Sequence, residues 1–161
     1  MKRFTLKNLF FNREGANTHF TERRKQKRPA NGYDLTILVV DDSRTVVAAF
    51  RKVLMQAGFN VVSADSGVQG IIQARLYIPD LILMDVVMPE LNGFQTTRRI
   101  RDDDLTSHIP IIFVSGEEHP TEQYWGTRAG ANGFLSKPVD RGLFFSRIFD
   151  VLEKHAVIKV Q

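Results

Sequence analysis

The sequence predicts an α/β fold: a five-stranded parallel sheet, doubly wound, with helices on both of its faces. Two observations carry this prediction. The strand-like runs are short and nearly continuously apolar, and they alternate five times with amphipathic helical segments in roughly 120 residues. Strands that are buried on both faces have this composition, and right-handed crossovers then favour a doubly wound (βα)5 arrangement. The 161 residues, 43% of them hydrophobic, suffice for one such domain plus a tail.

The first strand is expected at 35–40, a β-branched apolar run. Asp42 or Ser43 can cap the helix that follows, and the apolar residues of this helix recur at helical spacing until Gly58 ends it. The same strand–helix unit then recurs along the rest of the chain. The further strands are expected at 59–63, 81–84, 109–114 and 133–135, and the further helices at 67–77, 93–101, 122–129 and 139–154.

The charge of the chain is unevenly distributed, and this separates a tail from the folded part. Residues 1–34 carry nine Lys or Arg and three Asp or Glu, a net charge of +6, whereas residues 35–161 carry thirteen and fifteen, a net charge of −2. We therefore expect a flexible basic extension at 1–34, a domain at 35–155 and a short tail at 156–161. The slightly acidic domain argues against a surface for specific nucleic-acid binding.

The composition excludes several kinds of site. The chain has no cysteine, so it has no disulfide, thiolate nucleophile or cysteine-based zinc site. This is compatible with the cytoplasm, where we expect the protein. The four histidines show no spacing typical of metal ligands. No apolar run approaches the ~18 residues that a membrane-spanning helix needs.

Polar side chains follow four of the predicted strands. Asp41 and Asp42 follow the first, Asp85 the third, Ser115 the fourth and Lys137 the fifth. Each has a plain structural explanation when taken alone, such as a helix cap for the aspartate pair or a turn for Asp85. In a parallel α/β sheet, however, ligands bind beyond the carboxyl ends of the strands. The joint occurrence therefore favours one common site.

The chemistry of such a site follows from its charges. Three clustered carboxylates repel one another unless a cation lies among them. Mg²⁺ is a hard ion that accepts carboxylate oxygens, and Lys137 would add a second positive charge. Together these groups suit a tetrahedral anion and an aspartate nucleophile. The residues thus indicate phosphoryl transfer to a carboxylate.

Four stretches resemble the receiver domains of two-component response regulators: LVVDDS (38–43), LILMDVVMPELNGF (81–94), IIFVSG (111–116) and GANGFLSKPV (130–139). They occur in the order of the family, at the matching strand ends, and the resemblance covers about 35–154. It implies a flavodoxin-like fold with strand order 2-1-3-4-5. It also implies a phosphoacceptor in place of an enzyme, with only self-phosphorylation from small donors and autodephosphorylation.

Carried over position by position, the resemblance implies a phosphoacceptor and a metal site. Asp85 would accept the phosphoryl group from a histidine kinase. Asp42 would bind Mg²⁺ directly and Asp41 directly or through water, while Asp85 and the backbone carbonyl of Val87 would add further ligands. The apolar side chain of Val87 cannot orient an attacking water by hydrogen bonding, so the lifetime of the phosphate stays open.

The remaining positions would bind the phosphate and respond to it. Ser115 would hydrogen-bond a phosphoryl oxygen, and Lys137 would pair with its charge. The peptide bond between Lys137 and Pro138 would be cis, as is typical of the family. Phe134 stands at the switch position where many receivers have Tyr, so signalling through a tyrosine hydrogen bond is absent here.

A closer resemblance is to stand-alone receivers of twitching-motility chemosensory systems, of the PilH/PilG type, over 85–98 and 124–140. It implies a chemotaxis-type histidine kinase as partner. Because the chain ends soon after the last predicted helix, we expect no output domain and a signal that passes to a downstream protein. That protein would bind the face formed by the last strand and the helices before and after it, which carries Phe134.

Two alternatives stay open at this point. A Mg²⁺-dependent phosphatase of the haloacid-dehalogenase class also uses an aspartate nucleophile, but it would have a second Asp where this chain has Val87. The basic tail at 1–34 would act as a tether if it bound nucleic acid or a membrane surface through attraction that weakens with salt. The other interpretation of the tail is an extension without structure.

Overall fold

The computed structural model describes residues 34–116, 120–155 and 157. The expected extension, apart from residue 34, and most of the tail expected at 156–161 lie outside these residues. The strands are β1 (Thr36–Val40), β2 (Asn60–Ala64), β3 (Leu81–Asp85), β4 (Ile111–Ser115) and β5 (Gly133–Ser136). The helices are α2 (Arg44–Gln56), α3 (Gly67–Tyr77), α4 (Gly93–Arg101), α5 (Pro120–Ala129) and α6 (Arg141–Lys154).

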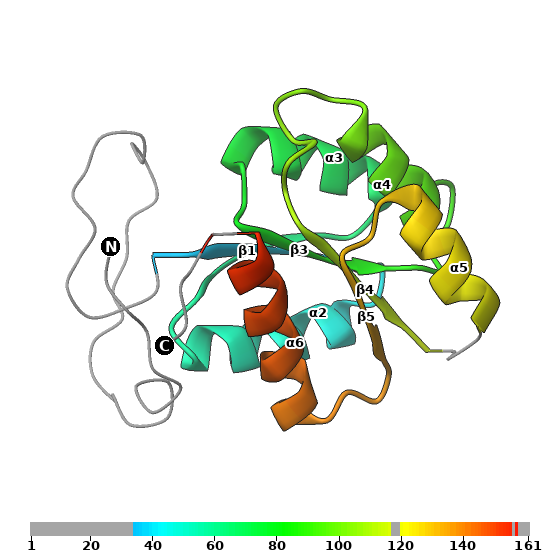
Figure 1. Ribbon diagram of the computed structural model, residues 1–161. Coiled ribbons are helices and arrows are strands. Elements are labelled where there is room, and N and C mark those ends of the chain that lie inside the picture. Colours follow the sequence, from blue (N-terminus) through cyan, green and yellow to red (C-terminus); the bar gives the residue numbers. More distant parts are fainter. Residues whose placement is uncertain (1–33, 117–119, 156, 158–161) are drawn as a thin grey trace.

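The five strands form one parallel sheet in the order β2-β1-β3-β4-β5, which confirms the predicted flavodoxin-like topology. Figure 1 shows α2 and α6 on one side of this sheet and α3, α4 and α5 on the other. Because successive strand residues point to opposite faces, each strand supplies both cores. In β1, for example, Ile37 and Val39 face α2 and α6, whereas Leu38 and Val40 face α3 and α4.

Most element boundaries lie within two residues of the predicted ones. Helix α2 is capped by Ser43, whose Oγ accepts a hydrogen bond from the Val46 amide, and not by Asp42. Helix α6 begins two residues later than predicted, because the side chain of Asp140 accepts from the Leu143 amide and acts as its N-cap. Because Ser43 caps α2, the side chain of Asp42 does not serve as a helix cap.

The register of the sheet brings the strand ends to one edge. Val40, the last residue of β1, pairs with Met84, and Asp85 pairs with Val114 on the neighbouring strand β4. Ser115 at the end of β4 pairs with Ser136 at the end of β5. Parallel strands in this register place the polar residues that follow them side by side.

Candidate functional site

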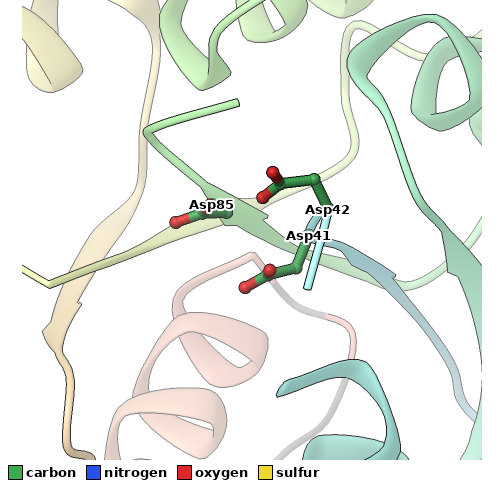
Figure 2. Close-up of side chains that lie close together, drawn as sticks. All are labelled: Asp41, Asp42 and Asp85. Carbon is green, nitrogen blue, oxygen red and sulfur yellow. The ribbon is translucent and has the colours of Figure 1, made fainter. Parts of the chain in front are cut away.

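The acidic residues gather at the carboxyl edge of the sheet. Asp41 follows β1 and is only 2% exposed, Asp85 ends β3 and is 7% exposed, and Asp42 is exposed. One carboxylate oxygen from each of the three lies within 4.8 Å of the others. Figure 2 shows the three side chains together at the ends of their strands. The structure therefore brings together the three carboxylates that the sequence singled out.

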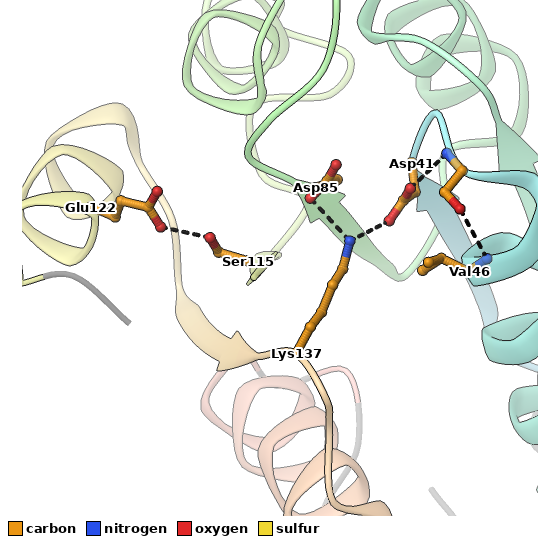
Figure 3. A network of polar contacts seen from close by, with 7 residues as sticks. Asp41, Val46, Asp85, Ser115, Glu122 and Lys137 are labelled. Atoms are coloured by element: carbon orange, nitrogen blue, oxygen red, sulfur yellow. Dashed lines mark hydrogen bonds and ion pairs between the residues drawn. The ribbon is translucent and has the colours of Figure 1, made fainter. Parts of the chain in front are cut away.

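Lys137 extends from the end of β5 into this cluster (Figure 3). Its Nζ lies 2.7 Å from Oδ2 of Asp41 and 3.2 Å from Oδ1 of Asp85. Its backbone amide donates to the carbonyl of Ser115 at 2.7 Å, and its peptide bond to Pro138 is cis. Burial by itself would lower the pKa of Lys137, but the hydrogen bond to Asp41 and the charges of both aspartates outweigh it and raise that pKa.

Asp85 is the electrostatically unfavourable member of the cluster. Its pKa lies above the ordinary value, first because burial disfavours the charged carboxylate and second because Asp41 repels it. The ion pair with Lys137 and a hydrogen bond from the Val86 amide act in the opposite direction and offset this only in part. The negative charge of the cluster is therefore larger than the positive charge that the ammonium group of Lys137 supplies.

Ser115 is buried at the end of β4, and its hydroxyl is engaged. Its Oγ donates a hydrogen bond to Oε2 of Glu122 at 2.6 Å (Figure 3). The sequence analysis assigned Glu122 no role, because its place in the first turn of the next helix does not by itself show which side chain it meets. The side chain of Val87, two residues beyond Asp85, is 72% exposed.

Phe134 lies on β5 and packs inward against the sheet. Its ring is half-buried and meets the ring of Phe113 edge-on, with centroids 5.7 Å apart. The ring also lies over Gly126 of α5, so closely that a Cβ built on this glycine would be 2.4 Å from the Phe134 Cζ atom. The glycine therefore provides the space that the ring occupies.

A family model for the response regulator receiver domain matches residues 37–149 of this chain, well over half of it. The chain belongs to the response regulator receiver family. Its matched residues run from β1 to α6 and include every residue of the acidic cluster and Lys137. Receiver domains are phosphoacceptor signalling modules of two-component systems and not classical enzymes.

The relatives with similar sequences differ in how much of their own length this chain covers. It is 44% identical over 116 residues to "Protein PilH" of Pseudomonas aeruginosa, an alignment that covers 72% of this chain and 96% of PilH. It is 35% identical over 112 residues to the response regulator PleD of Caulobacter vibrioides, covering 70% of this chain but only 25% of PleD. The similarity thus spans nearly the whole length of PilH.

Solved structures agree with the assignment of the receiver fold. The chemotaxis protein CheY4 of Vibrio cholerae superposes with a TM-score of 0.71 at 28% identity, covering 73% of this chain and 98% of CheY4. The receiver domain of a histidine kinase from Syntrophus aciditrophicus gives 0.68 at 27% identity, covering 74% and 91%. Among the described residues, no helix is long and apolar enough to cross a membrane.

Proposed function

We propose that this receiver accepts a phosphoryl group on Asp85 from a phosphohistidine of a histidine kinase. A carboxylate oxygen of Asp85 attacks phosphorus, the P–N bond breaks as a P–O bond forms, and the departing imidazole takes up a proton from solvent. The observation that carries the proposal is the position of Asp85, which ends the central strand β3 and is joined through the ammonium of Lys137 to a second buried carboxylate, that of Asp41.

The acidic cluster has the donor set that Mg²⁺ prefers. Its oxygens lie within 4.8 Å of one another, and the single ammonium of Lys137 offsets their repulsion only in part. Asp41, Asp42, Asp85 and the backbone carbonyl of Val87 would hold the ion. When bound, it would offset the negative charge that these carboxylates present to an incoming phosphoryl group.

The residues around Asp85 then bind the product. Lys137 already contacts Oδ1 of Asp85, so its ammonium is placed to pair with a phosphoryl group on that carboxylate. Ser115 ends β4, the strand next to β3, and its hydroxyl can donate a hydrogen bond to a phosphoryl oxygen. Phe134, on the next strand β5, would respond to the movement of Ser115 as the switch aromatic.

The signal would leave through the face formed by α5, β5 and α6. The exposed apolar residues Tyr124 and Trp125 of α5 and Leu143 of α6 are 54%, 47% and 53% exposed, which suits a protein partner. Similarity to PilH over nearly its whole length supports a chemotaxis-type kinase and a role in twitching motility. Under this proposal the chain acts in the cytoplasm by binding a downstream protein.

The phosphoacceptor is tested by incubating the protein with acetyl phosphate and Mg²⁺ and measuring the added mass. The wild type should gain one base-labile phosphate per chain, and Asp85→Asn should gain none. Asp150→Asn, which makes the same change at an exposed position on α6, should be labelled like the wild type. Chelation of the metal should abolish labelling, because the carboxylates then repel the donor.

Two outcomes would contradict the proposal. Label retained in Asp85→Asn would place the phosphate elsewhere. Sustained release of inorganic phosphate over many turnovers, without an accumulating labelled chain, would instead favour the aspartate-nucleophile phosphatase.

A further inference from the structure

The hydrogen bond between Ser115 and Glu122 assigns a role to helix α5. We propose that Glu122 is a positioning residue that holds the Ser115 hydroxyl away from Asp85 and thereby opposes phosphorylation. This inference rests on the proposed function, because it concerns how readily Asp85 is phosphorylated. It adds a residue outside the acidic cluster that sets the balance between the two states of the receiver.

The contact has the geometry of a strong hydrogen bond. The Ser115 Oγ lies 2.6 Å from Oε2 of Glu122, within the range of hydroxyl–carboxylate bonds, which are about twice as strong as neutral ones. Ser115 is 7% exposed, so little water competes for its hydroxyl. The bond joins the end of β4 to the first turn of α5.

The chemistry makes the two partners of Ser115 mutually exclusive. A serine hydroxyl has one proton to donate. The carboxylate of Glu122 accepts the hydrogen bond from this hydroxyl. A phosphoryl group on Asp85 would also present only acceptor oxygens. Ser115 therefore has to leave Glu122 before it can donate to the phosphate. The free energy gained from the bond between Ser115 and the phosphate is therefore reduced by the free energy of the bond to Glu122 that is lost.

Helix α5 links this exchange to the proposed output face. Glu122 and Gly126 are four residues apart and lie on the same side of the helix. The first holds Ser115, and the second provides the space for the ring of Phe134. Tyr124 lies on the opposite side of the helix, and both Tyr124 and its neighbour Trp125 are exposed. Release of Glu122 would thus free the turn of α5 that precedes these two residues.

Substitution of Glu122 should make the receiver easier to phosphorylate. In Glu122→Ala the acceptor is gone, and the initial rate of labelling by acetyl phosphate should rise at least about tenfold, as expected for loss of one hydrogen bond to a charged group. Glu122→Gln keeps an amide oxygen that can accept from Ser115 but loses the charge, so its rate should be intermediate. Glu153→Gln, an exposed glutamate on α6, is the matched control and should label like the wild type.

A double-mutant cycle shows whether Glu122 acts through Ser115. In a Ser115→Ala background no hydroxyl is held, so adding Glu122→Ala should change the rate by less than about twofold. If the full increase persists in that background, Glu122 acts by simple charge repulsion and the inference is wrong. It is also wrong if the Glu122→Ala and Glu122→Gln rates both equal that of the wild type.

A spectroscopic readout follows the same contact directly. With beryllofluoride and Mg²⁺ as the phosphate mimic, the side-chain carboxyl ¹³C resonance of Glu122 should shift in the wild type and stay unchanged in Ser115→Ala. An unchanged resonance in a wild-type protein that does bind beryllofluoride contradicts the inference alone. Failure of the wild type to be labelled at all would instead contradict the proposed function.

Discussion

Asp85 combines burial with a neighbouring like charge, and this arrangement is unfavourable for the folded protein. Its carboxylate is 7% exposed and shares the site with Asp41, while Lys137 neutralises only part of the negative charge. Residues placed for chemistry commonly keep such a mismatch between charge and environment. The unfavourable charge of Asp85 should therefore be measurable as a loss of stability in the protein without metal.

We expect Asp85→Asn to raise the thermal unfolding midpoint in a chelating buffer at neutral pH by roughly 2–5 °C. The pKa of Asp85 is raised in the folded protein, so its charged form destabilises the fold at a pH above that pKa. As the pH falls through the raised pKa, the wild-type carboxyl takes up a proton and the advantage of Asn should disappear.

Thermal scans of both proteins between neutral and acidic pH test this expectation. Asp42→Asn is the control, because Asp42 belongs to the same cluster but is exposed, and it should change the midpoint less. A lower midpoint for Asp85→Asn at neutral pH would mean that the ion pair with Lys137 outweighs burial and repulsion.

Among the helices, α5 is the one on which the switch residues depend. It contacts Ser115 through Glu122, and it accommodates Phe134 at Gly126. A different helix fixes the start of β5. The guanidinium of Arg101, at the end of α4, donates to the carbonyls of Ser107, Ile109 and Gly130 and to the side chain of Asn132. Contacts between elements, and not within them, thus determine how the switch residues lie.

Gly126→Ala should displace the ring of Phe134. The new Cβ would lie 2.4 Å from the Phe134 Cζ and 2.8 Å from the Phe113 Cδ2, closer than carbon atoms approach one another. The end of the Phe134 side chain can move more easily than the backbone. We therefore expect changed ring resonances for both phenylalanines and a loss of stability of about 1–3 kcal/mol, typical of an overpacked core.

Aromatic NMR spectra and chemical unfolding measure these two effects. Gly116→Ala is the matched control, since a Cβ on Gly116 would have no atom within 4 Å. Unchanged Phe134 resonances in Gly126→Ala would show that α5 moves and the ring does not.

The receiver accounts for the chain from β1 to α6. The family match begins at residue 37 and ends at 149, and PilH aligns over 72% of the chain. The basic residues of 1–34 lie ahead of this region, and residues 1–33 lie outside the described part of the structure. The division into an extension at 1–34, a domain at 35–155 and a tail at 156–161 stays a prediction.

Deletion of residues 1–32 should leave both the unfolding midpoint and the labelling rate of the receiver nearly unchanged. The family match begins only at residue 37, so the deleted residues lie outside the receiver that this match defines. Thermal scans and acetyl phosphate labelling of the two chains provide the comparison. A loss of several degrees would mean that apolar residues such as Phe4 or Phe10 pack on the domain.

The same pair of proteins tests the tether. If the full chain binds anionic vesicles or DNA in a way that weakens with salt, and the shortened chain does not, the extension has that role. Equal binding by the two chains would show that the extension is not a tether.

The doubly wound parallel sheet and the edge that carries the site could be predicted from local patterns, because apolar runs mark the strands and the residue after each strand must lie at its carboxyl end. Asp41, Asp42, Asp85 and Lys137 are found together for this reason. The strand order was predicted only from the resemblance of four motifs to receiver domains. The cap at Ser43 was one of two residues that the sequence allowed.

The pairing of side chains between elements could be seen only in the folded structure. That Glu122 accepts from Ser115, and that Gly126 lies under Phe134, depends on how α5 sits against the sheet. The sequence places Glu122 seven residues after Ser115, a spacing with no fixed meaning once a loop intervenes. Helix and strand periodicities act within an element, whereas the position of one element on another follows from the packing of the whole core.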